Sequence, residues 1–80
     1  MKTDNELIAL FVTHQDKDAF AQLVNRYQSG IRQFLRRLTA GDHAQADDIA
    51  QDTFLLMYRK LHTFKGDAAL KTWLHRIAYN

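Results

Sequence analysis

The sequence contains no cysteine and no proline, and only three of its 80 residues are glycine. The absence of cysteine excludes disulfides and thiolate metal sites, and it leads us to expect a reducing compartment. With no proline, few glycines and 46% apolar residues, the chain is predicted to be all-helical with short connections. Its length is that of one small domain.

Long apolar runs and enzyme signatures are also missing. No segment is long enough to cross a membrane, and residues 1–15 combine acidic residues with no small-residue cleavage site, unlike a signal peptide. We therefore expect a cytoplasmic protein without membrane insertion. No GxSxG motif, phosphate-binding loop or dinucleotide fingerprint occurs, so neither an enzyme nor a bound cofactor is expected. His43 and Asp47 have metal-ligand spacing, but no third ligand of matching geometry is evident, so we expect no metal site.

The net charge is only +2, yet the charges are unevenly distributed. Residues 41–56 hold four acidic residues and no cation, whereas residues 57–80 hold five cations and one acidic residue. Helix-dipole matching explains acidic residues near the start of a helix, but not Lys65, Lys71 and Arg76, which lie beyond that helix. Adjacent acidic and basic segments are typical of a protein that meets two different partners on neighbouring surfaces.

Apolar residues recur at helical spacing in four segments, which predicts four helices. The segments cover about residues 3–14, 16–41, 44–61 and 67–80. Thr3 and Glu6 have the spacing of a capping box, and an aspartate at position 16 or 18 can cap the second helix. The apolar phase continues through Gly30, where a kink and a break both remain open. Asp67 is expected to cap the last helix.

The apolar faces of these helices are predicted to meet in one core, giving an all-α, compact bundle of about four helices. The expected core residues are Phe20, Leu23, Tyr27, Ile31, Phe34, Ile49, Met57, Leu61, Leu70, Trp73, Leu74 and Ile77. Because Trp73 lies within the apolar stripe of the last helix, we expect it to anchor the core rather than to stack on a base.

One leucine of the third helix points away from the predicted core. Helical spacing surrounds Leu55 with Asp48, Gln51, Asp52 and Arg59. An apolar residue ringed by carboxylates suits a helical partner that carries basic residues around an apolar ridge. A single exposed leucine is equally compatible with an ordinary surface.

Aromatic residues and cations lie close together in the last third of the chain. The less clearly buried aromatic residues are Tyr58, Phe64 and Tyr79, and the cations are Lys65, Lys71 and Arg76. Single-stranded nucleic acid requires this pairing, because cations hold the phosphates and rings or a pocket hold unstacked bases. A solvated helix surface needs the cations but not the rings.

These residues resemble the second conserved region of bacterial sigma-70 family factors, with the closest match to the extracytoplasmic-function (ECF) group. The motif D-x-x-Q-[DE]-x-F is found in Asp48, Gln51, Asp52 and Phe54. The motif F-[RK]-G-[DE]-x-x-[LF]-x-T-W-L-x-R-I-A-x-N is found in residues 64–80. Residues 19–39 match the earlier helices of the family more loosely, so the resemblance covers nearly the whole chain and implies the helical fold of region 2.

The resemblance implies a domain that binds core RNA polymerase, recognises the promoter −10 element and helps to open it. Docking on the clamp helices of the largest polymerase subunit would fall to Asp48, Gln51, Asp52 and Leu55. The loop before the last helix would hold a base flipped out of the non-template strand, and the last helix would contact the strand and the adjoining duplex. The implied DNA-binding residues are Phe64, Lys65, Gly66, Asp67, Ala68, Lys71, Arg76 and Asn80.

The family normally continues through a linker to a C-terminal helix-turn-helix domain that reads the −35 element, and this sequence stops before such a domain. The resemblance also implies an anti-sigma factor as a partner.

Two other functions remain open. A duplex-binding helix-turn-helix regulator would have a tight turn before a recognition helix rich in base-reading residues. A helical protein-interaction module would leave the cations of residues 65–76 as solvated charges.

Overall fold

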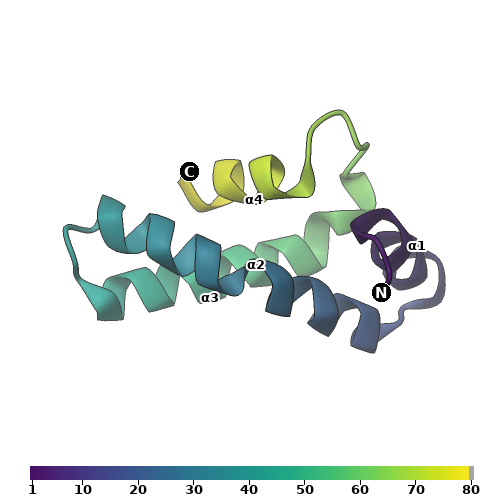
Figure 1. Cartoon of the computed structure of the whole chain (residues 1–80), viewed down its shortest axis with the longest axis horizontal. Helices are drawn as coiled ribbons and strands as arrows, with labels where there is room; N and C mark the ends of the chain where they lie inside the picture. Colours follow the sequence, from purple (N-terminus) through teal and green to yellow (C-terminus); the bar gives the residue numbers. More distant parts are fainter. Residues whose placement is uncertain (80) are drawn as a thin grey trace.

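The computed structural model describes residues 1–79, which form four α-helices and one short 3₁₀ helix (Figure 1). The elements are α1 (Asp4–His14), α2 (Lys17–Leu38), α3 (His43–Lys60), η1 (Leu61–Thr63) and α4 (Leu70–Tyr79). No strand occurs in this described part of the chain. The predicted all-α bundle of about four helices is confirmed.

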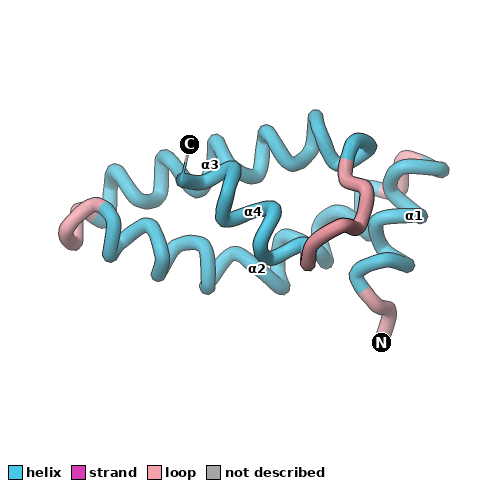
Figure 2. The backbone as a smooth tube through the Cα atoms, turned by 90° about the horizontal axis from the view of Figure 1, so that it is seen from above, coloured by secondary structure: helices cyan, strands magenta, loops and turns pink. Residues whose placement is uncertain are grey.

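The long helices α2 and α3 run antiparallel and pack against each other, while α4 lies over one face of this hairpin (Figures 1 and 2). Helix α1 packs at the end of the hairpin where α2 begins. The loop between η1 and α4, residues 64–69, lies at the same end as α1 (Figure 2). The start of the chain is therefore brought close to the loop that precedes the last helix.

The first two helices begin as the sequence predicts. The backbone N–H of Glu6 donates to Thr3 Oγ1 over 3.2 Å, and the N–H of Thr3 donates to Glu6 Oε1 over 3.1 Å, which confirms the capping box. Asp16 rather than residue 18 caps α2, because its carboxylate accepts from the N–H of Ala19 at 3.1 Å. Helix α2 continues through Gly30 without a break.

A tight turn joins α2 to α3 and makes the two helices antiparallel. Gly41 has a φ of +85°, in the left-handed region that favours glycine, and its N–H donates to the carbonyl of Arg36 over 2.8 Å. Asp42 then caps α3 by accepting from the N–H of Gln45 at 3.0 Å. The glycine and the cap at residues 41 and 42 fix where one long helix ends and the next begins.

The prediction that Asp67 caps the last helix is wrong. Helix α4 begins at Leu70, and the first helical carbonyl belongs to Ala69, which accepts from the N–H of Trp73 at 3.1 Å. Gly66 has a φ of +79°, and the chain bends over residues 66–68 before it becomes helical. The turn at this glycine leaves Asp67 in the loop, where its carboxylate is exposed.

One apolar core holds all four helices together. Its buried residues are Leu7, Phe11, Ala19, Leu23, Ile31, Leu35, Ala46, Ala50, Met57, Leu61, Leu70, Leu74 and Ala78. The core also holds the buried Thr53, whose hydroxyl donates to the carbonyl of Ile49 over 2.7 Å and is thereby satisfied.

The predicted core list is half right. Six of its members are buried, and the other six are only partly buried: Phe20, Tyr27, Phe34, Ile49, Trp73 and Ile77. All of these except Ile77 pack against the core from its edge. The central positions between helices belong partly to Ala46, Ala50 and Ala78, because closely packed helices leave little room for larger side chains.

Candidate functional site

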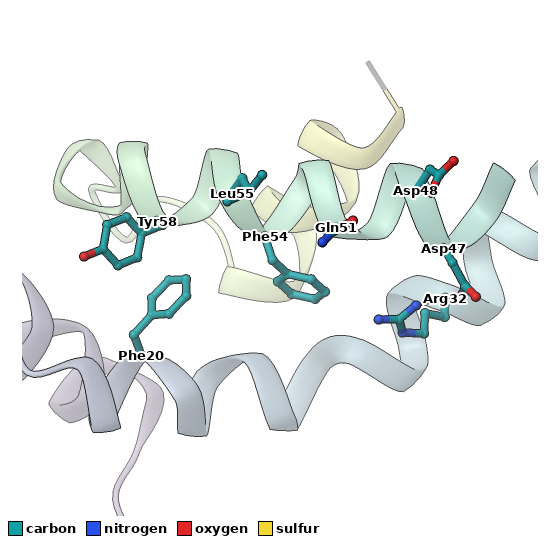
Figure 3. A pocket seen from close by; sticks show the side chains of 8 residues that line it. All are labelled: Phe20, Arg32, Asp47, Asp48, Gln51, Phe54, Leu55 and Tyr58. Carbon is teal, nitrogen blue, oxygen red and sulfur yellow. Dashed lines mark hydrogen bonds and ion pairs between the residues drawn. The ribbon is translucent and has the colours of Figure 1, made fainter. Parts of the chain in front are cut away.

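A groove of about 460 Å³ lies between α2 and α3 (Figure 3). Its lining residues are Phe20, Arg32, Asp47, Asp48, Gln51, Phe54, Leu55 and Tyr58. The ring of Phe54 points from α3 toward α2, and the ring of Phe20 points from α2 toward α3 (Figure 3). Apolar rings therefore line the interior of the groove, and helix α4 contributes none of its walls.

Three of the four residues predicted for polymerase docking lie on this groove. Asp48, Gln51 and Leu55 line it, and Leu55 is 53% exposed despite its apolar side chain. Asp52 is exposed but is not among the lining residues. The outer face of α3 thus presents one apolar side chain between acidic and amide groups, as its helical spacing predicts.

The two ends of the groove differ in chemistry. At one end the rings of Phe11, Phe20 and Tyr58 form a cluster with centroid distances of 5.0 to 5.1 Å. At the other end Arg32 pairs with Asp47 over 2.7 Å, which offsets the charge of that carboxylate. The acidic character available to a partner therefore comes mainly from Asp48 and the neighbouring face of α3.

Sequence reasoning missed the second wall of this groove. It placed Phe20 in the core and gave Arg32 no partner, because the pattern along one helix does not show which side chains of another helix face it. The Arg32–Asp47 pair joins residues 15 positions apart. Only the antiparallel packing of α2 on α3 brings these groups together.

The loop between η1 and α4 borders two further cavities. The smaller one, about 170 Å³, is lined by Thr63, Phe64, Lys65, Asp67, Ala68, Trp73 and Arg76. The larger one, about 520 Å³, is lined by Thr3, Asp4, Asn5, Phe64, Gly66, Asp67, Ala68, Ala69 and Leu70. A single loop thus separates a cavity against α4 from a cavity against the start of α1.

The predicted DNA-binding residues divide between these cavities and the open surface of α4. Apart from Gly66, the loop residues of the predicted base pocket line the smaller cavity together with Arg76, whereas Gly66 lines only the larger one. Lys71 is exposed on α4 and lines neither cavity. Asn80 lies outside the residues that the structure describes.

Trp73 is partly exposed and lies where the core meets the smaller cavity. Its ring lies 5.4 Å from that of Phe64, centroid to centroid, and both rings pack against the core. On the other side of α4, the ring of His75 lies 4.7 Å from that of Phe34, and its Nδ1 is 2.7 Å from the carbonyl of Lys71. The contact between Phe34 and His75 joins α4 to α2, and the contact between Phe64 and Trp73 joins α4 to the loop before it.

The described residues contain two ion pairs, Asp4 with Arg26 and Asp47 with Arg32. Lys65, Lys71 and Arg76 take part in neither pair, and all are exposed. Over the same part of the chain, no group of three or more potential metal-ligating side chains occurs. None of the helices of residues 1–79 combines the length and the apolar character needed to span a bilayer.

The first sequence motif, Asp48 to Phe54, thus lies on α3 at the groove, and the second, which begins at Phe64, covers the loop and α4. Residues 23–80 match the family model described as sigma-70 region 2. The chain belongs to this family. The match includes most of α2 and all of the groove and loop residues discussed above, except Phe20 and the residues of α1.

Curated relatives place this sigma-70 region 2 chain in the ECF group. It is 38% identical over 78 residues to the ECF RNA polymerase sigma-E factor of Haemophilus influenzae, covering 98% of this chain and 40% of the relative. It is 45% identical over 69 residues to the RNA polymerase sigma-H factor of Pseudomonas aeruginosa, covering 86% and 35%. It is 40% identical over 79 residues to the ECF RNA polymerase sigma factor SigM of Mycobacterium tuberculosis, covering 99% and 39%. The chain thus spans at most 40% of the length of these relatives.

Proposed function

We propose that this chain is the part of an ECF sigma factor that joins core RNA polymerase to the promoter −10 element and helps to melt it. The observation that carries the proposal is the groove on α3. Its exposed Leu55 stands beside Asp48 and Gln51, at the position of the D-x-x-Q-[DE]-x-F motif of the family. The names of the relatives, as RNA polymerase sigma factors, support the same assignment.

The polymerase side of the proposal follows from the chemistry of the groove. An apolar floor with an exposed leucine and an acidic rim fits a helical partner with an apolar ridge flanked by basic residues. We assign this partner as the clamp helices of the largest polymerase subunit, bound by Asp48, Gln51, Asp52 and Leu55. The rings of Phe54 and Tyr58, which line the same groove, extend the apolar part of this surface.

The DNA side of the proposal rests on the loop and α4. Exposed Lys65, Lys71 and Arg76 would bind the phosphates of the non-template strand, and position assigns Asn80 to the same surface. The loop of residues 64–68 and the smaller cavity would take a base flipped out of the strand. The connection over residues 61–69 is too long for the tight turn of a helix-turn-helix, which argues against a duplex-reading regulator.

We also propose an anti-sigma factor as a partner, because a protein that covers the groove and the loop would keep the domain from binding polymerase and DNA. It would have to compete for the groove, for the loop, or for both. Its binding should therefore exclude core polymerase or single-stranded DNA.

The test is a pair of binding measurements on the 80-residue chain. We expect capture of core RNA polymerase, and we expect tighter binding to a single-stranded −10 oligonucleotide than to the same sequence as a duplex. A preference for duplex would indicate a helix-turn-helix regulator, and polymerase binding without any DNA binding would indicate an interaction module. Failure to capture core polymerase would overturn the assignment of the groove.

A further inference from the structure

The larger cavity beside the loop is walled by the start of α1, which lies outside the residues that match the family model. Thr3, Asp4 and Asn5 line it, opposite the loop of residues 64–69. This cavity shares Phe64 and other loop residues with the smaller cavity. A single DNA strand bound by the loop would therefore have a cavity on each side of that loop.

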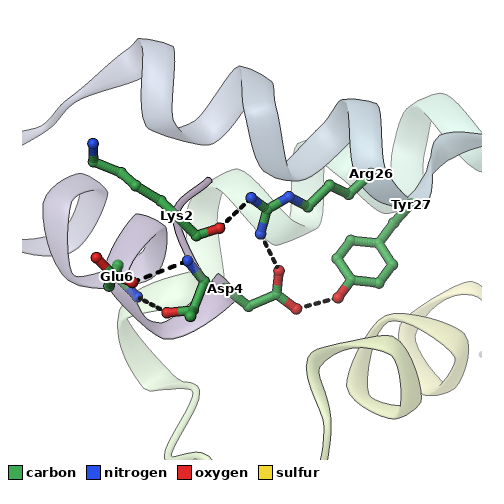
Figure 4. Close-up of polar contacts among 6 residues, drawn as sticks. Lys2, Asp4, Glu6, Arg26 and Tyr27 are labelled. Carbon is green, nitrogen blue, oxygen red and sulfur yellow. Dashed lines mark hydrogen bonds and ion pairs between the residues drawn. The ribbon is translucent and has the colours of Figure 1, made fainter.

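The start of α1 is a fixed wall rather than a loose chain end (Figure 4). Arg26 of α2 donates to Asp4 Oδ1 over 2.9 Å and also to the carbonyl of Lys2, and the hydroxyl of Tyr27 donates to the other oxygen of Asp4. Burial, and to a smaller extent this hydrogen bond, raises the pKa of Tyr27 to about 12. These contacts of Asp4 with Arg26 and Tyr27, called the clasp below, tie α1 to α2. They also set the position of the next residue, Asn5.

Asn5 is the polar side chain of this wall that remains available to a ligand. The carboxylate of Asp4 is engaged by the clasp, and Thr3 is engaged by the capping box. Asn5 is exposed and lines the cavity, and it belongs to neither the capping box nor the contacts of Asp4. A carboxamide offers both a donor and an acceptor, which suits it to read the edge of a base.

The charges around the cavity indicate which part of a nucleotide it would take. Asp67 lines it with a carboxylate that takes part in neither ion pair, whereas the carboxylate of Asp4 is paired with Arg26. No lysine or arginine among residues 1–79 lines the cavity, so the lining offers a phosphate a negative charge and no cation. A carboxylate does accept hydrogen bonds from the exocyclic amino group of a base. The lining therefore fits the edge of an amino-bearing base (adenine, cytosine or guanine) better than the edge of thymine, which alone has no exocyclic amino group.

We propose that this cavity takes a second unpaired base of the same DNA strand, and that Asn5 is a specificity-determining residue for it. Asp4 acts as a positioning residue, because the clasp orients the wall that carries Asn5. The inference rests on the proposed binding of single-stranded DNA by the loop. It adds the start of α1 to the DNA surface and predicts a second position of base preference.

The test measures binding of the 80-residue chain to single-stranded −10 oligonucleotides in which each position carries each of the four bases in turn. Asn5→Ala should reduce the preference for the amino-bearing bases adenine, cytosine and guanine over thymine at one position, on the order of tenfold. The preference at the position read by the smaller cavity should persist. Asn25→Ala, an exposed asparagine on α2, is the matched control and should change neither preference.

The possible outcomes separate this inference from the proposed function. If loop substitutions alter base preference and Asn5→Ala alters none at any position, the second site is refuted while strand binding by the loop stands. If the parent chain shows no preference for single strands over duplex, both proposals are overturned. Melting curves of the variants verify folding, which the exposed position of Asn5 should leave intact.

Discussion

At the residue scale, the hydroxyl of Tyr27 links two helices and gives the fold a pH dependence. Because burial and the hydrogen bond to Asp4 raise its pKa from 10.0 to about 12, the folded state keeps this proton more tightly than the unfolded state. The contribution of the Tyr27 hydroxyl to the free energy of unfolding is fully present below pH 10 and should be lost as the pH rises through 12.

Denaturant unfolding between pH 9 and pH 12.5 checks this prediction. The free energy of unfolding should fall over that range in the parent chain, and Tyr27→Phe should remove most of the tyrosine-linked fall. Tyr79→Phe is the matched control, because Tyr79 is 71% exposed and its removal should leave the fall intact. A parallel decline in the parent and in Tyr27→Phe would show that the clasp does not carry the effect.

The same residues show how far single positions can be predicted from the sequence. The capping box of Thr3 and Glu6 is local and was predicted correctly, since both partners lie within one turn. The clasp joins Asp4 to residues 22 and 23 positions away, which no spacing rule connects. Trp73 was expected as a core anchor and is only partly buried, because helical phase gives the direction of a side chain but not the depth of the core beneath it.

At the scale of elements, the groove between α2 and α3 predicts a localised effect on polymerase binding. Leu55→Asp should weaken the affinity for core polymerase by about 2 kcal/mol or more, because it places a charge in a desolvated contact. Folding should persist, since Leu55 is 53% exposed. The measurement is a titration of core polymerase with the labelled chain.

A second exposed leucine provides the control for this variant. Leu38 is 51% exposed at the end of α2 and does not line the groove, so Leu38→Asp should leave the polymerase affinity unchanged. Equal losses from both variants would show that general surface polarity, rather than the groove, decides the affinity. Equal binding by Leu55→Asp and the parent would place the docking surface elsewhere.

Helix α4 predicts an effect on the salt dependence of DNA binding. Lys71 is exposed beside the loop, and each phosphate contact contributes about 0.7 to the slope of log affinity against log salt for single strands. Lys71→Ala should therefore lower the slope by about 0.7 and weaken binding to all sequences alike. Lys17→Ala, an exposed lysine at the start of α2, should leave the slope unchanged, and an unmoved slope in Lys71→Ala would refute the phosphate contact.

The elements themselves were largely predictable, and their mutual packing was not. Apolar periodicity gave four helices in the right order, because each helix buries one face. The start of α4 was placed too early because Asp67 is a good cap by type, whereas the bend after Gly66 decides where the helix can begin. The interior of the groove could not be foreseen, since Phe20 and Phe54 come to line one groove only through the packing of α2 on α3.

At the scale of the whole molecule, the two proposed surfaces are separate parts of one small bundle. The groove is lined by α2 and α3, whereas the DNA surface consists of the loop and α4, with the start of α1 added by the second cavity. The two sets of lining residues have no member in common. Asp47 and Asp48 of the acidic segment line the groove, whereas the exposed cations Lys65, Lys71 and Arg76 lie in the loop and on α4.

This separation predicts that damage to the two surfaces adds without coupling. Leu55→Asp should weaken polymerase binding and leave the affinity of the chain for a single-stranded −10 oligonucleotide unchanged, and Lys71→Ala should do the reverse. In the double variant each loss should equal that of the single variant to within about 0.5 kcal/mol, as expected for independent sites. Titrations of the parent chain, the two single variants and the double variant with polymerase and with DNA measure these losses of affinity. A coupling above about 1 kcal/mol would mean that α3, which packs against α4 as well as forming the groove, transmits a change from one surface to the other.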